Sequence, residues 1–229
     1  MKAALNALRG AVCLAAALTL SACVIAGPPA KDYTAFRAAS PRSILVVPAL
    51  NNTVSVEAPD FFLSTISQPF GERGYYMFPA YMVKRLLEED GLSDAGLVHN
   101  ADASRFGALF GCDAVLFVSI ERWESQYIVI SSSTNVEFTY TLKSCRTGQA
   151  LWTDTQSMTY SPQASNSGNP LADLLAQAIV SALEKAAPNY IPLAKMANLQ
   201  ASTIAGRGLP AGPYLPEQHL KDATAFPAN

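Results

Sequence analysis

The chain has 229 residues, of which 15% are charged, and its formal net charge at pH 7 is −2. Nucleic-acid-binding domains carry a strongly basic face, so this balance argues against DNA or RNA as a partner. Without an N-terminal signal about two hundred residues remain, which is enough for one domain with a real core and too few for two.

The first 23 residues have the pattern of a bacterial lipoprotein signal. Lys2 and Arg9 form a positive segment before an apolar run at 11–20, and Leu-Ser-Ala-Cys stands at the end of the run, at 20–23. A membrane-spanning helix needs about 20 apolar residues, so this run is too short to be a stable anchor. We expect cleavage between Ala22 and Cys23 and acylation of Cys23, which would attach the chain to a bilayer through its lipid. An ordinary secretory signal is the alternative interpretation.

Residues 23–42 are expected to form a lipidated tether. Val24 follows the cysteine, whereas lipoproteins retained in the inner membrane commonly have Asp at this position. We therefore expect an outer-membrane location, for which the periplasmic face is the commoner orientation. At about 3.3 Å per residue the extended tether would hold the domain on the order of 60 Å from the lipid. Docking of Tyr33 and Phe36 on the domain would shorten that reach.

Residues 43–187 are predicted to form a single α/β domain. The run at 43–48 is apolar, β-branched and ends in proline, which indicates a buried central strand. Asp102 can cap a helix, and the alternating apolar side chains before Leu142 indicate a half-buried antiparallel strand. In chain order, the pattern predicts a strand at 43–48, a helix at 60–70, a strand at 75–78, helices at 79–90 and 103–110, strands at 114–120, 126–142 and 150–160, and a helix at 170–187.

These elements predict an α/β or α+β fold, in which helices cover one or both faces of a mixed β-sheet. The helix at 170–187 is expected to pack on the sheet. Residues 188–229 are rich in proline and glycine, and we expect an irregular C-terminal tail wrapped over the domain.

The sequence contains no recognised catalytic pattern. Gly-x-Ser-x-Gly, His-Glu-x-x-His, the Walker loop and Gly-x-Gly-x-x-Gly are all missing, and the chain has two histidines, His99 and His219. No Cys-x-x-Cys motif accompanies those histidines. We therefore expect a protein that is not an enzyme, with no cofactor and no metal site.

Two cysteines remain after the signal and the lipidation site. Cys112 precedes a predicted buried strand, and Cys145 lies in the turn at 143–148, so both can lie at the same end of one sheet. A disulfide between them is one interpretation, since the expected compartment permits it. The other is one buried thiol and one turn residue.

Trp123 and Tyr127 flank a predicted turn at the end of the sheet. Bulky aromatic side chains beside an exposed turn have no obvious core to enter, which favours an interaction surface. Burial in the core is the alternative for both.

Several segments together resemble a family of Gram-negative outer-membrane lipoproteins of unknown biochemical role, typified by the neisserial genome-derived lipoprotein antigens. They are 31–37, 41–48, 74–79, Phe-Gly-Cys-Asp-Ala at 110–114, Thr-Gly-Gln-Ala-Leu-Trp at 147–152 and Gly-Leu-Pro-Ala-Gly-Pro-Tyr at 208–214.

The resemblance implies a fold similar to the N-terminal domain of the Tol-system periplasmic protein. It also implies a gene that is often a neighbour of one for a curli-secretion-like lipoprotein, and hence an envelope assembly. Cys112 and Cys145 depart from the family pattern, where Ala and a polar residue such as Asp are expected. This departure supports a lineage-specific disulfide.

Two functions follow from these observations. The first is a non-catalytic component of an envelope assembly that docks on other lipoproteins or on itself, including as a homodimer. The second is a periplasmic ligand-binding or regulatory subunit of an envelope transporter or cell-wall enzyme. A deep apolar pocket would favour the second, and a flat aromatic patch near Trp123 the first.

Overall fold

The computed structural model describes residues 31–128, 131–161 and 190–228. The expected signal, the lipidation site and the helix expected at 170–187 lie outside these ranges. The described elements are α2 (Thr34–Ala39), β1 (Ser43–Val46), β2 (Leu50–Asn51), α3 (Ala58–Glu72), β3 (Tyr76–Met77), α4 (Ala80–Glu89), α5 (Ala95–Asn100), α6 (Ala103–Phe110), β4 (Ala114–Ile128), β5 (Ser131–Ser144), β6 (Ala150–Tyr160), α8 (Ile191–Thr203) and α9 (Pro216–Lys221).

The described strands form a six-stranded mixed sheet, which confirms the predicted α+β class. The strand order is β3-β1-β4-β5-β6, and β2 also pairs with β4. β1 runs parallel to β3 and β4, whereas β4, β5 and β6 form an antiparallel meander. The central strand is β4 rather than β1, because β4 is long enough to pair with β1, β2 and β5 along its length.

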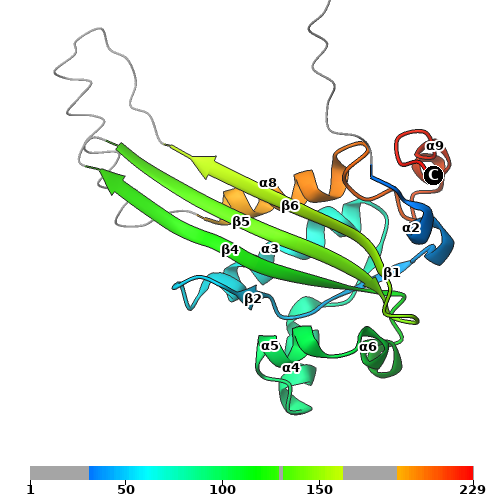
Figure 1. Ribbon diagram of the computed structural model, residues 1–229, viewed down its shortest axis with the longest axis horizontal. Helices are drawn as coiled ribbons and strands as arrows, with labels where there is room; N and C mark the ends of the chain where they lie inside the picture. Colours follow the sequence, from blue (N-terminus) through cyan, green and yellow to red (C-terminus); the bar gives the residue numbers. More distant parts are fainter. Residues whose placement is uncertain (1–30, 129–130, 162–189, 229) are drawn as a thin grey trace, which may run out of the picture.

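Alternating side chains of β1 enter two separate cores, which explains why this strand is apolar throughout. Ile44 and Val46 face the larger core beneath α2, α3 and α8. Leu45 and Val47 face the smaller core, which α4, α5 and α6 cover. The sheet therefore has helices on both faces, although α4 to α6 lie over one end of it only (Figure 1).

β4 is longer than the sequence pattern predicted. It continues through a bulge between Ile120 and Arg122 and pairs with β5 as far as Ile128. The predicted strand ends at 120, where the charged residues Glu121 and Arg122 follow. They do not end β4, because Arg122 and Glu124 are exposed and Arg122 Nη2 lies 3.7 Å from Glu137 on β5.

The expected tether is folded from residue 31 onward. Tyr33 and Phe36 are buried, and the Tyr33 hydroxyl donates a hydrogen bond to the Gly208 carbonyl at 2.6 Å. Only residues before 31 are left as candidates for a free linker, which makes the expected reach of about 60 Å too long.

The expected irregular tail contains two helices, α8 and α9. α8 packs on α3 and β6 through small residues, among them the fully buried Ala194, Ala197 and Ala201. Alanine gives a weak amphipathic pattern, so a search for large apolar side chains misses this helix. The C-terminal residues beyond α8 also contribute to the larger core through Leu209 and Phe226.

Candidate interaction surface

β4, β5 and β6 extend past the helices as an antiparallel arm (Figure 1). We define the arm as residues 121–128, 131–139 and 153–160. The inner face at its beginning, with Trp123 and Phe138, still packs in the larger core, and its tip extends past the helices (Figure 1). β6 is the last strand in the sheet order, so no described strand pairs with its outer edge. Backbone N–H and C=O groups along such an edge are available to another chain.

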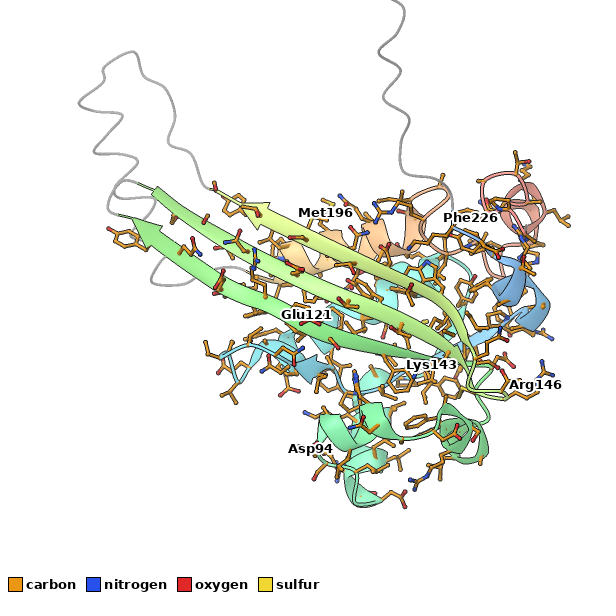
Figure 2. All side chains as sticks on the ribbon, in the orientation of Figure 1. Asp94, Glu121, Lys143, Arg146, Met196 and Phe226 are labelled. Atoms are coloured by element: carbon orange, nitrogen blue, oxygen red, sulfur yellow. A yellow bond between two sulfur atoms is a disulfide. The ribbon has the colours of Figure 1, made fainter. Side chains whose placement is uncertain are left out.

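The exposed face of the arm is polar. Thr153, Thr155, Ser157 and Thr159 of β6 are exposed, and Thr155 pairs across the strands with Thr139 of β5. Figure 2 labels Asp94 of the α5 region and Arg146 of the β5–β6 turn, both far from the tip of the arm. The described helices α4 to α6 therefore leave this Ser/Thr-rich face uncovered.

The carboxylate of Asp154, the one acidic group of β6, is buried and paired. Its side chain is 1% exposed, and its Oδ1 lies 2.5 Å from Lys31 Nζ and 3.3 Å from Arg207 Nη2. Burial lowers the pKa of the Lys31 ammonium group, although the attraction of Asp154 acts in the opposite direction. The ion pairs hold residue 31 against the beginning of the arm, where the chain arrives from the expected lipid anchor.

Trp123 is a core residue and does not form an exposed surface. It is 3% exposed, and its ring stacks against Tyr190 at 4.8 Å between centroids and against Phe61 at 6.5 Å. The expectation of exposure assumed a turn at this point, but β4 continues, and its pleat directs Trp123 into the larger core. Tyr127, four residues further along β4, is half-buried, so the two aromatic residues do not form one exposed patch.

Cys112 and Cys145 form a disulfide in the structure, with their Cα atoms 6.0 Å apart. Both lie in the smaller core, where Cys112 precedes β4 and Cys145 follows β5. The Cys145 N–H donates to the Asp113 carbonyl at 2.9 Å, so the strand ends are also joined through the backbone. The link fixes α6 to the antiparallel pair at the end of the sheet opposite the arm tip.

The described residues offer little that resembles a ligand or metal site. Three surface hollows measure about 60, 270 and 240 Å³, whereas small-molecule sites usually measure about 300 to 1,000 Å³. Within the described ranges, no three His, Cys, Asp or Glu side chains gather in a way that could hold a metal ion. No helix in the same ranges has the length and apolar character needed to cross a bilayer.

The outer edge of β6 is a candidate site that was not predicted from the sequence. A signal for it was present, since 153–160 alternates small hydroxylated residues with larger ones and contains neither Lys nor Pro. Such a strand lacks the residues that usually protect an edge. Its position at the end of the sheet order, however, is a tertiary property that the local pattern does not contain.

Comparison with known proteins assigns this α+β domain to the lipoproteins. A family model described as "Putative lipoprotein GNA1162-like" matches residues 31–214. The chain therefore belongs to the GNA1162-like lipoprotein family, which confirms the resemblance found in the sequence.

The neisserial relatives agree with this assignment. "Putative lipoprotein NMB1124/NMB1162" of Neisseria meningitidis serogroup B is 36% identical over 168 residues, which are 73% of this chain and 77% of the relative. The crystal structure of lipoprotein GNA1162 from Neisseria meningitidis is 32% identical, with a TM-score of 0.52, and the match covers 63% of this chain and 99% of that one. A PelC dodecamer structure from Paraburkholderia phytofirmans is more distant, at 17% identity and a TM-score of 0.40, over 68% of this chain and 91% of that one.

Proposed function

We propose that this chain is an outer-membrane lipoprotein that acts as a non-catalytic component of an envelope protein assembly. In this proposal, cleavage after Ala22 exposes Cys23, acyl chains on Cys23 enter the bilayer, and the domain faces the periplasm. Its partners are other envelope lipoproteins, a curli-secretion-like lipoprotein among them, or further copies of the chain.

One observation carries the proposal: the arm presents a strand edge that no described strand covers, together with an uncovered polar face. Strand addition to such an edge gains main-chain hydrogen bonds and needs no prepared pocket. Membership of a lipoprotein family and the Leu-Ser-Ala-Cys sequence at 20–23 support the anchor. The small hollows offer no comparable support for the ligand-binding alternative.

The proposal is tested by mild crosslinking of native membranes, followed by capture through an affinity tag placed after Asn229. The chain with Cys23→Ala serves as the control, because it keeps the described domain and removes the acylated residue. Recovery of other lipoproteins or of further copies with the anchored chain, and much less with the control, is the expected result. Recovery of the anchored chain alone, as a monomer, would contradict the proposal.

A further inference from the structure

We infer that the partner at the edge of the arm is a second copy of this chain, whose β6 pairs antiparallel with the first β6 so that Ser157 faces Ser157 of the other copy. The inference rests on the proposed function and specifies it. The pairing would join the two arms into one continuous sheet.

The register follows from the direction of one carbonyl group. The Thr153 carbonyl accepts a hydrogen bond from the Lys31 ammonium group, so it points away from β5. In an antiparallel strand both backbone groups of a residue point to the same side, and the side alternates along the strand. The outward backbone groups are therefore those of Thr153, Thr155, Ser157 and Thr159. The Thr153 carbonyl is already bonded to Lys31. Three outward residues remain available to a partner strand, and Ser157 is the middle one.

The two edges of the arm differ in how well they are protected. The last pairing of β4 with β2 is Asn51 with Ile120, and the β4 edge that follows carries a bulge and the charged residues Glu121, Arg122 and Glu124. Bulges and charges of this kind keep strand edges apart. The β6 edge has neither beyond Asp154, so β6 is the edge that accepts another strand.

A second β6 is electrostatically compatible with the first. The Asp154 carboxylate is already neutralised by Lys31 and Arg207, and the residues from 155 to 160 are uncharged, so self-pairing brings no like charges together. The register places Thr155 opposite Thr159 of the other copy, and such hydroxylated pairs stabilise antiparallel strands. The contact is self-complementary, as two-fold symmetry requires.

The free edge of β6 is short, so we expect the pairing to depend on anchoring of both chains in one membrane. Three outward residues supply only a few main-chain hydrogen bonds, each with a net contribution of about 1 kcal/mol. Two chains anchored in one bilayer have a higher effective concentration than free chains, which favours a weak contact. We therefore expect a dimer that forms on the membrane more readily than in dilute solution.

The test is disulfide formation by Ser157→Cys in the full, membrane-anchored chain. With Cys23 acylated and Cys112 bonded to Cys145, the introduced cysteine is the one free thiol of the mature protein. Facing positions in antiparallel strands have Cα atoms about 5.5 Å apart, within the range that a disulfide spans. We expect a reducible dimer through position 157 under mild oxidation. The matched control is Gln126→Cys, an exposed position on β4, which should give at least several-fold less.

Register is tested with Thr155→Cys and Thr159→Cys. Each variant alone should crosslink weakly, whereas the two chains expressed together should give a mixed dimer. Chemical crosslinking of the wild-type chain in native membranes is the second measurement: we expect a crosslinked dimer, and Ser157→Lys should abolish it. Equal crosslinking at 126 and 157 would overturn the inference.

The failures of the two proposals can be told apart. A disulfide from the Ser157→Cys chain to a different envelope protein would overturn the inference and leave the proposed assembly role standing. No adduct at position 157, together with capture of a monomer from native membranes, would overturn both.

Discussion

The Tyr140 hydroxyl of β5 donates a hydrogen bond to Asn198 Oδ1 of α8 at 2.8 Å, and both side chains are fully buried. Asn198 Nδ2 in turn donates to Thr65 Oγ1 of α3 at 2.9 Å, and Thr65 donates to the Phe62 carbonyl at 2.7 Å. Burial raises the pKa of Tyr140 well above its ordinary value, so its hydroxyl keeps its proton. This chain of hydrogen bonds joins the sheet to α3 and α8.

Tyr140→Phe should lower the free energy of unfolding by about 1 to 3 kcal/mol, because it leaves the buried Asn198 carbonyl oxygen without its donor. Urea unfolding of the Cys23→Ala chain measures the change. Tyr160→Phe removes the same hydroxyl from an exposed position and is the matched control. Equal losses in the two variants would show that the buried hydrogen bond contributes nothing specific.

Gly212→Ala should destabilise the packing of the C-terminal segment on residues 73–75, which connect α3 to β3. The Gly212 N–H donates to the Arg73 carbonyl at 2.8 Å, and a Cβ atom at 212 would overlap the Gly74 carbonyl. Overpacking of this kind costs about 1 to 3 kcal/mol. Limited proteolysis should release the residues after α8 faster. Gly71→Ala, where the new Cβ meets only Met77 at 3.6 Å, should leave the cleavage rate unchanged.

His99 should make the domain less stable in acid. Burial lowers the pKa of His99 most, the hydrogen bond from Nε2–H to the Pro48 carbonyl at 3.1 Å opposes this, and Lys143 adds to the lowering. Below about pH 6.5 the unfolded chain therefore binds more protons than the folded chain, so the free energy of unfolding falls as the pH drops from 6.5 through the lower folded pKa.

His99→Gln tests this, because glutamine can donate to Pro48 and does not titrate. Urea unfolding at a series of pH values should show a smaller loss of stability below pH 6.5 in the variant than in the wild type. Parallel pH profiles for the two proteins would rule out His99 as the titrating group.

The disulfide should contribute substantially to stability. It links residues 33 apart in the sequence, and closing a loop of that length is associated with about 3 to 4 kcal/mol. The double variant Cys112→Ser/Cys145→Ser cannot form the disulfide, and its unfolding midpoint in urea should be lower than that of the wild type. A thiol assay on unfolded, unreduced protein should find neither cysteine free, and two free thiols per chain would show that the bond does not form.

The sequence predicts most of the sheet because the signals there are local and strong. The run at 43–48 is apolar throughout since both faces of β1 are covered, and Asp102 caps α6 as expected, with its side chain accepting a hydrogen bond from the Ser104 N–H. Gly111 ends the same helix in a left-handed conformation, with φ at 68°. These residues determine their own local structure.

The sequence does not predict features that depend on contacts between residues far apart in the chain. Tyr33 and Phe36 dock on the domain as expected, but their partners, the Gly208 carbonyl and Phe226, come from the far end of the chain, and no pattern near residue 33 records that contact. Trp123 is buried because Phe61 and Tyr190 cover it. The exposed edge of β6 depends on strand order, which local periodicity does not specify.

Site-specific photocrosslinking in native membranes tests most directly the claim that the arm is the interaction surface. A photoreactive amino acid at position 155 on β6 is compared with one at 89 on α4, where Glu89 is also exposed but lies outside the arm. We expect adducts from 155 to a second copy or to another envelope protein, and none from 89. No adduct at 155, or equal adducts from both positions, would contradict the claim.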